Sequence, residues 1–336
     1  MINMEKIRIG IIGLGWFGEH HIDTYKSLPL AEVAAVCTRR ADHMQEIAAK
    51  YSIKKTYTDY HDLLADKDID MVSIVTHVSD HMKPSIDAIK AGKHVFLEKP
   101  MANNVDECDM ILDALKNTDK SFMVGHVCRF DTSCALAKEE IAAGNIGKII
   151  SIHAKRNLAR WVTESSLNKI SALFGDGIHD FDLMLWFTGA KPKTVYAQTA
   201  NTRPEFKYDD IGWALFRLDD GTFAVVENDW SLPDNVPYAI DAKMEIIGSE
   251  GIINIDNSGN NYSVLTKKGM SYPQATYWPK VNGMRRGYLK EEFDYFLKCI
   301  ADGKKPTVIT PQESRDVVYA MRMAEKSAAE NRVIEF

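Results

Sequence analysis

Near the start of the chain, three glycines have the spacing of a phosphate-binding turn. The segment Gly13-Leu14-Gly15-Trp16-Phe17-Gly18 follows a short apolar run and precedes a stretch with helical periodicity. Gly13 permits a tight turn, Gly15 lets a pyrophosphate approach the backbone, and Gly18 lets the helix pack on the strand. N–H groups at the start of the helix would bind the phosphates. The same pattern occurs in structural turns, but its place between a strand and a helix favours a dinucleotide site made of Gly13, Gly15, Trp16, Phe17 and Gly18.

The residues about 20 positions beyond these glycines decide which dinucleotide binds. A carboxylate there would bind the 2′-hydroxyl of the adenine ribose and favour NAD(H). This chain has Thr38, Arg39 and Arg40 at that place. A hydroxyl and a guanidinium suit a 2′-phosphate, so the sequence favours NADP(H). NAD(H) stays open, because the arginines are equally compatible with a solvated loop and Asp42 is near enough to supply the missing acid.

A lysine follows a later apolar run, in the segment Glu98-Lys99-Pro100. In parallel α/β sheets, ligands lie beyond the carboxyl ends of the strands, which places Lys99 in the crevice. Pro100 favours an extended backbone at the residue before it. A lysine beside a hydride-transfer centre stabilises a developing alkoxide or takes part in proton transfer. Alone, however, a Lys-Pro pair is also common in surface turns.

A histidine in the second half of the chain stands between two carboxylates. Asp176, His179 and Asp182 are spaced three residues apart, so a helix that begins early enough places them on one face. A histidine held by a carboxylate is a suitable general acid–base near neutral pH. The structural alternative is a helix cap at Asp176 followed by a surface His–Asp pair.

Positioning these residues requires two kinds of architecture. Strand-like runs alternate with helical stretches as far as Gly125, which is typical of βαβ units and a doubly wound parallel sheet. Beyond Gly125, successive β-rich runs without helices indicate an open, mostly antiparallel sheet, with a hairpin turn at Asp219-Asp220-Gly221. The sequence thus predicts an α/β fold with a Rossmann-like dinucleotide-binding domain at 1–125 and an α+β domain for substrate binding and oligomerisation at 126–336.

The individual elements follow from apolar periodicity. The expected strands are 7–12, 33–36, 70–75, 95–97, 121–124, 149–154, 194–199, 212–218, 222–228, 242–247 and 251–255. The expected helices are 17–27, 41–51, one from Pro84 to Gly92, 133–143, one around His179, 290–301 and 313–331.

Composition excludes several classes of protein. The net charge of −6 argues against nucleic-acid binding. With 45% hydrophobic and 26% charged residues, the chain is expected to be globular. It has no apolar stretch long enough for a membrane span and no secretory signal. The five cysteines are scattered without a Cys-x-x-Cys pair, which predicts free thiols in the cytoplasm and no metal site.

Taken in order, these motifs resemble the Gfo/Idh/MocA (glucose–fructose oxidoreductase / inositol dehydrogenase) family over nearly the whole chain. The markers are the glycine loop and the segments 75–81, 91–100, 124–130, 179–182 and 248–251. The resemblance implies NAD(P)-dependent oxidation of a secondary alcohol on a sugar or cyclitol. It also implies an acid–base pair of Lys99 and His179. Contacts to the nicotinamide ribose are implied for Glu98, Lys99 and a loop with Thr76, Ser79 and His81.

One position departs from that family. Many members carry an aspartate four residues before the histidine, where this chain has Gly175 and, one residue later, Asp176. Either Asp176 takes over the role or the proton relay differs.

Substrate contacts are expected from Arg129, Arg156, Trp161 and Asp182. Further candidates of polar or aromatic type are Asn157, Arg160, Asp229, Trp230, Tyr277, Trp278, Arg285 and Arg286. Two other functions stay open: an oxidoreductase with a permanently bound cofactor, and a non-catalytic dinucleotide-sensing regulator. The presence of both Lys99 and His179 favours an enzyme. Apolar residues on both faces of the 212–218 strand predict a homodimer or homotetramer that pairs through the second sheet.

Overall fold

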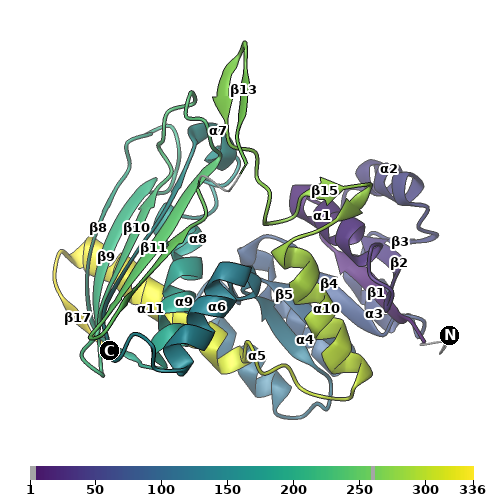
Figure 1. Cartoon of the computed structure of the whole chain (residues 1–336). Coiled ribbons are helices and arrows are strands. Elements are labelled where there is room, and N and C mark those ends of the chain that lie inside the picture. Colours follow the sequence, from purple (N-terminus) through teal and green to yellow (C-terminus); the bar gives the residue numbers. More distant parts are fainter. Residues whose placement is uncertain (1–4, 259–261) are drawn as a thin grey trace. The chain divides into compact units, whose positions relative to one another are not determined.

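The computed structural model describes residues 5–258 and 262–336. The chain forms two compact units (Figure 1). The first contains the residues up to Phe130 and the returning segment Tyr277–Arg315; the second contains Asp131–Thr276 and Asp316–Phe336. The sequence predicted a single boundary after residue 125, whereas the returning segment belongs by its contacts to the first unit. The functional division that goes with that boundary stays a prediction.

Aromatic packing explains why the segment Tyr277–Arg315 belongs to the first unit. Helix α10 (Tyr288–Ala301) buries Phe293 and Phe296 completely. The ring of Phe293 stacks on Tyr25 at 4.1 Å between centroids, and Phe296 lies 5.9 Å from Phe96. Burying an aromatic side chain removes 150–250 Å² of surface from water, on the order of several kcal/mol.

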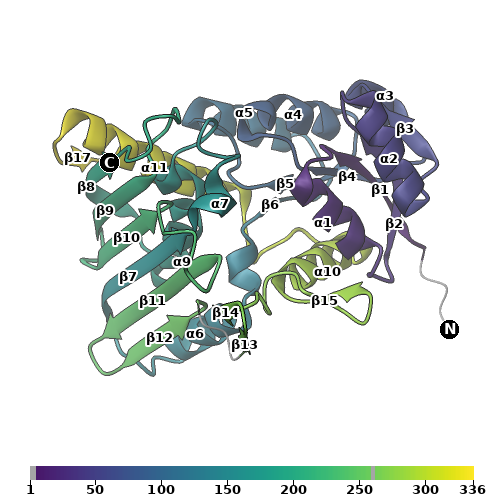
Figure 2. The same cartoon turned by 90° about the horizontal axis from the view of Figure 1, so that it is seen from above.

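The first unit is a parallel sheet with helices on both faces. The strand order β3-β2-β1-β4-β5-β6 reverses between β1 and β4, where a doubly wound sheet binds its ligand. Helices α4 and α5 lie on one face, and α1 and α10 on the other (Figure 2). The strands are β1 (Ile7–Ile12), β2 (Ala31–Cys37), β3 (Lys55–Tyr57), β4 (Met71–Ile74), β5 (His94–Glu98) and β6 (Phe122–Gly125). The helices besides α10 are α1 (Trp16–Tyr25), α2 (Ala41–Tyr51), α3 (Tyr60–Ala65), α4 (Met82–Lys90) and α5 (Val105–Leu115), with the 3-10 turns η1 (Val78–Asp80) and η2 (Val127–Phe130).

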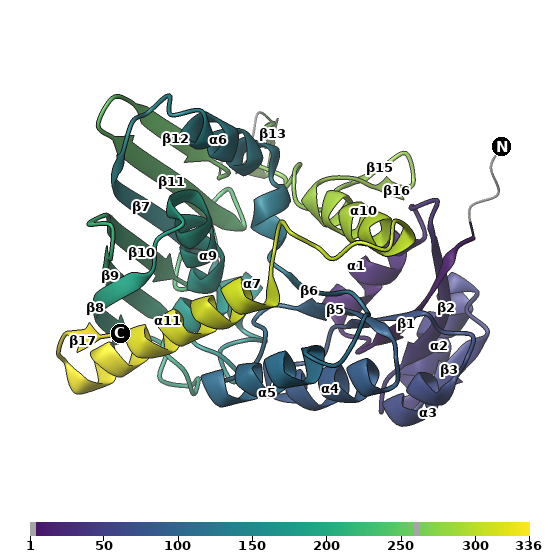
Figure 3. The same ribbon diagram turned by 90° about the horizontal axis from the view of Figure 1, so that it is seen from below.

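The second unit is a mixed sheet with helices on one face (Figure 3). Its order is β12-β11-β7-β10-β9-β8-β17; the pairing of β7 with β10 is parallel and the others are antiparallel. The strands are β7 (Ile149–Leu158), β8 (Pro192–Ala200), β9 (Ile211–Leu218), β10 (Phe223–Asp229), β11 (Ile240–Gly248), β12 (Ile252–Asp256) and β17 (Ile334–Glu335). The helices are α6 (Thr132–Ala142), α7 (Arg160–Thr163), α8 (Ala172–Gly175), α9 (Gly177–Thr188) and most of α11 (Pro311–Glu330). Two small hairpins are β13–β14 (Val264–Thr266, Gly269–Ser271) and, in the first unit, β15–β16 (Lys280–Val281, Met284–Arg285).

The predicted fold class is confirmed, and each expected strand and helix is present within a few residues. The turn between β9 and β10 is also where it was expected, with Gly221 at φ +95°. Sequence reasoning missed several short elements, namely β3, α3, α7, α8, β17 and the two small hairpins. It also missed the longer helix α5, which has 11 residues. None of the helices in the described residues is long and apolar enough to cross a membrane.

The side chains of strand β9 alternate between the two faces of the second sheet. Ala214, Phe216 and Leu218 are buried, and the Phe216 ring lies 4.0 Å from Phe181 of α9. On the other face, Trp213 and Leu215 remain 47% and 45% exposed. A charge at Phe216 would therefore disrupt the core, whereas a charge at Leu215 would test the predicted interface.

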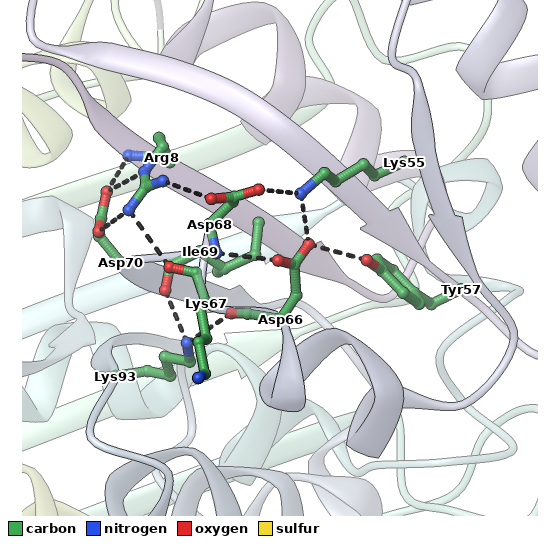
Figure 4. A network of polar contacts seen from close by, with 9 residues as sticks. All are labelled: Arg8, Lys55, Tyr57, Asp66, Lys67, Asp68, Ile69, Asp70 and Lys93. Atoms are coloured by element: carbon green, nitrogen blue, oxygen red, sulfur yellow. Dashed lines mark hydrogen bonds and ion pairs between the residues drawn. The ribbon is translucent and has the colours of Figure 1, made fainter.

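Opposite the ligand-binding edge, a polar network holds the turn before β4 (Figure 4). Arg8 of β1 makes a bidentate contact with Asp70 at 2.8 and 2.9 Å, and Lys55 of β3 bonds to Asp66 and Asp68 at 2.7 and 2.8 Å. The hydrogen bond from Lys55, followed by one from the Asp68 N–H, lowers the pKa of Asp66 from its usual 3.8 to about 2. This network therefore ties the amino ends of β1 and β3 to the turn before β4.

We expect Lys55→Met to reduce the acid sensitivity of folding. The pKa of Asp66 is lower in the folded chain than in the unfolded chain. Its contribution to stability is therefore complete above about pH 4 and is lost as the pH falls towards about 2. Urea titrations across this range should show a smaller fall in unfolding free energy for Lys55→Met than for wild type. The exposed neighbour Lys54 is the control, and Lys54→Met should follow wild type. An equal fall in both variants would contradict the assignment.

Candidate active site

The glycine loop lies at the switch point of the first sheet, between β1 and α1. Gly13 has φ +102°, and a Cβ there would lie 2.5 Å from the carbonyl oxygen of Val75. A Cβ on Gly18 would collide with the Gly13 carbonyl oxygen, whereas a Cβ on Gly15 would meet no atom within 4 Å. Two glycines are thus required by the fold, and the third borders open space at the start of a helix. This arrangement fits the pyrophosphate of a dinucleotide.

The arginines after β2 differ in their surroundings. The Arg39 side chain is 87% exposed, with Nη2 3.3 Å from Asp80 Oδ2. Arg40 Nη2 instead donates to the Leu14 carbonyl oxygen at 3.2 Å, which His43 Nε2 also contacts at 2.7 Å. Arg40 therefore braces the glycine loop, whereas the Arg39 side chain lies largely in solvent. Thr38 is half-buried and Asp42 is exposed.

The loop after β4 is tied to the Glu-Lys-Pro segment. His81 is buried, with Nδ1 2.8 Å from the Pro100 carbonyl oxygen and Nε2 3.1 Å from that of Thr76. Burial lowers the pKa of His81, so the ring is neutral at pH 7 and has one N–H for these two acceptors. The Thr76 hydroxyl donates to the Asp80 carbonyl oxygen, and Ser79 is exposed. His81 thus holds the loop in place. Of the three loop residues predicted to contact the cofactor, Ser79 is the one exposed to solvent.

Glu98 and Lys99 follow one another at the carboxyl end of β5. Glu98 is 7% exposed, and its Oε2 accepts the Lys99 backbone N–H at 3.2 Å. A Cβ on Gly125, at the end of β6, would lie 3.1 Å from Glu98 Oε1. Lys99 is half-buried and is joined to Pro100 by a cis peptide bond. The motif thus lies at the edge of the sheet that carries the glycine loop, as predicted.

In the second unit, Asp176 and His179 meet at the start of α9. Asp176 precedes the first helical residue, and its Oδ1 lies 3.9 Å from His179 Nε2. The indole N–H of Trp230 donates to Asp176 Oδ2 at 2.9 Å. His179 is 8% exposed and Asp182 is fully buried. Asp176 and His179 are therefore close in space, and Trp230 orients the Asp176 carboxylate.

Trp230 also accounts for the glycine at position 175. A Cβ on Gly175 would lie 2.8 Å from the Trp230 ring. Trp230 is 3% exposed and packs with Leu158, Leu167 and Ala172, so it has little room to withdraw. A longer side chain at position 175 is excluded, and the carboxylate of this segment is that of Asp176, one residue later. No sequence signal connects residues this far apart in the chain.

The predicted substrate residues fall into two groups. Trp161 is 58% exposed on α7, whereas Arg129, Arg156 and Asp182 are buried. Arg129 Nη1 donates to the Val308 carbonyl oxygen at 2.6 Å and lies 2.9 Å from Glu313 Oε1. These contacts connect η2 to Val308 and to the first turn of α11, and the substrate contact at Arg129 stays a prediction.

Arg156 makes a buried, bidentate ion pair. Its Nη2 lies 2.7 Å from Asp180 Oδ1, and its Nε lies 3.1 Å from Asp180 Oδ2. This pair joins β7 to α9 next to His179. In the parts of the chain that the structure describes, no group of three or more His, Cys, Asp or Glu side chains is placed to hold a metal ion.

Residues 7–126 match the oxidoreductase family with an NAD-binding Rossmann fold (GFO_IDH_MocA), and residues 134–254 match the GFO/IDH/MocA C-terminal domain. The chain therefore belongs to the Gfo/Idh/MocA family. The predicted class, a nicotinamide-dependent oxidoreductase, is confirmed at this level.

Individual relatives agree with this class. The chain is 29% identical to the myo-inositol 2-dehydrogenase of Thermotoga maritima over 98% of both proteins. It is 30% identical to an uncharacterized oxidoreductase of Bacillus subtilis, over 76% of this chain and 75% of that protein. The crystal structure of myo-inositol 2-dehydrogenase from Lactobacillus plantarum has the same fold, with a TM-score of 0.86 at 24% identity over 99% of this chain and 100% of that one.

Proposed function

We propose that the protein oxidises a secondary alcohol of a cyclitol or sugar and transfers the hydride to a nicotinamide dinucleotide. The observation that carries this proposal is the fit of the Gly13–Gly18 loop to a pyrophosphate in a chain that also has Lys99 and His179 at the family's acid–base positions. The names of relatives support the substrate class, since two of them act on inositols.

The roles follow from the chemistry of each group. His179 takes the hydroxyl proton of the substrate, and Asp176, held by Trp230, favours the charged imidazolium that results. The Lys99 ammonium stabilises the oxygen as it develops negative charge. The bound dinucleotide supplies the acceptor for the hydrogen that leaves carbon as hydride. The alcohol becomes a ketone, its hydroxyl proton passes to His179, and the hydrogen on its carbon passes to the dinucleotide as hydride.

A substrate panel tests the proposal. The purified enzyme is incubated with myo-inositol, scyllo-inositol and common sugars, each with NAD and NADP, and the nicotinamide absorbance is followed. Turnover of at least one cyclitol or sugar is expected. Tight dinucleotide binding without any turnover would favour a dinucleotide-sensing regulator instead. Nicotinamide absorbance that co-purifies with the protein would favour a permanently bound cofactor.

We expect NADP(H) to bind about tenfold tighter than NAD(H), a difference of about 1.4 kcal/mol. The reason is that Thr38 and the exposed Arg39 offer a 2′-phosphate a hydroxyl and a guanidinium, with no carboxylate to repel it. Fluorescence titration of both reduced dinucleotides measures the ratio. Thr38→Asp should shift the preference towards NAD(H). Equal or reversed affinities in the wild type would refute the preference.

We also expect a homodimer or homotetramer paired through the exposed face of the second sheet. Leu215→Glu places a charge among Trp213, Tyr196 and Phe223, each at least 40% exposed. Light scattering should show an oligomer for wild type and a shift towards the 37.9 kDa monomer for the variant. Leu136→Glu, on the exposed side of α6, is the matched control. A wild-type mass of one chain at micromolar concentration would rule this interface out.

A further inference from the structure

A histidine outside the acid–base pair lies beneath the Glu-Lys-Pro segment. His21, on α1, has no exposed surface. Its Nε2 lies 3.0 Å from Glu98 Oε1, and its Nδ1 lies 2.9 Å from Ser73 Oγ on β4. The rings of Phe17 and Phe293 pack edge-on against it at 5.0 and 4.7 Å between centroids. One side chain thus connects the helix of the glycine loop to the ends of two strands.

The hydrogens in this network run in one direction. A carboxylate oxygen accepts, so His21 Nε2–H donates to Glu98 Oε1. With the ring proton directed at Glu98, the Ser73 hydroxyl is placed to donate to Nδ1. The Tyr25 hydroxyl donates to Ser73 Oγ at 3.4 Å. Burial raises the pKa of Tyr25, which therefore keeps its proton. Every donor along the path points towards the Glu98 carboxylate.

We propose that His21 is a positioning residue for Glu98. The Nε2–H fixes Oε1, and the Lys99 backbone N–H fixes the rotation of the carboxylate through Oε2. A carboxylate held in this way presents its remaining acceptor sites to a vicinal diol, the chemical group of a nucleotide ribose. Because His21 and the glycine loop share α1, a single helix sets both the pyrophosphate contact and the orientation of this carboxylate.

The inference rests on the dinucleotide binding of the proposed function and on the contact with the nicotinamide ribose that the family resemblance implies for Glu98. It does not depend on the substrate or on turnover. Its test therefore measures only binding, so failure of the inference and failure of the proposed reaction give different results.

The test replaces His21 with Gln and with Asn, whose side-chain amides place an N–H donor at different positions. The Gln amide reaches the position of Nε2, whereas the shorter Asn amide reaches only that of Nδ1. We expect His21→Asn and His21→Leu to weaken binding of the reduced dinucleotide by about tenfold, the order of a hydrogen bond to a charged group. His21→Gln should stay within about threefold of wild type. Ser73→Ala, which removes only the partner of Nδ1, should resemble His21→Gln.

Two further measurements separate positioning from a general structural effect. Binding of ADP, which lacks the second ribose, should be the same in wild type and in all variants. In a double-mutant cycle, His21→Asn should cost little once Glu98→Gln is present. If His21→Leu does not fold, the comparison of Gln with Asn still decides. Equal weakening by Gln and Asn, additive effects with Glu98→Gln, or a parallel loss of ADP binding would each overturn the inference.

Discussion

Replacing Lys99 with alanine is expected to lower kcat by about 10²-fold or more while dinucleotide affinity stays close to that of wild type. In the proposed mechanism the ammonium stabilises an oxygen that becomes charged only in the transition state, so its loss acts on the chemical step. His179→Ala should have an effect of the same size, because without the imidazole the hydroxyl proton has no positioned acceptor. Steady-state rates combined with dinucleotide titrations separate the two quantities.

A control for the histidine substitution lies in the second unit. His153 is half-exposed on the outer face of the second sheet, and His153→Ala should retain wild-type kcat. Asp176→Asn tests the charge next to His179, because the amide keeps the shape of the carboxylate but removes its charge. If Lys99→Ala or His179→Ala retains most of the activity, that residue is neither acid nor base in the reaction.

Breaking the buried Arg156–Asp180 pair is expected to give the largest loss of stability. Both side chains are less than one-tenth exposed, and Asp180→Asn removes the charge that pairs with two nitrogens of the Arg156 guanidinium in a buried site. Removing one partner of such a pair costs about 3–5 kcal/mol. Urea unfolding should show this as a lower midpoint for the second unit. The same substitution in the exposed pair of Lys116 with Asp113 should cost less than about 1 kcal/mol.

This experiment also separates two roles of Arg156. If the pair is structural, replacing both partners with apolar residues, as in Arg156→Met with Asp180→Leu, should recover much of the stability lost in Asp180→Asn. If Arg156 binds substrate, Arg156→Met should raise KM strongly in protein that is still folded. Unchanged stability in Asp180→Asn would contradict the structural role.

Local features of this protein were determined by its sequence. The three glycines, the strand before them and the helix after them lie next to one another in the chain, so their order alone predicts the phosphate-binding turn. The alternation of apolar runs predicted the parallel sheet for the same reason. The spacing of three residues between Asp176, His179 and Asp182 determined that a helix would place them together.

Contacts between distant segments were decided by the tertiary structure. Phe216 and Leu215 are neighbours of equal apolar character, and only the packing of α9 determines which of them is buried. The return of α10 to the first unit depends on aromatic surfaces that meet across much of the chain. Trp230 beside Asp176 and His21 beside Glu98 each join residues more than fifty positions apart. Periodicity reports which face of an element is apolar, but the partner of that face is set by how the elements pack in space.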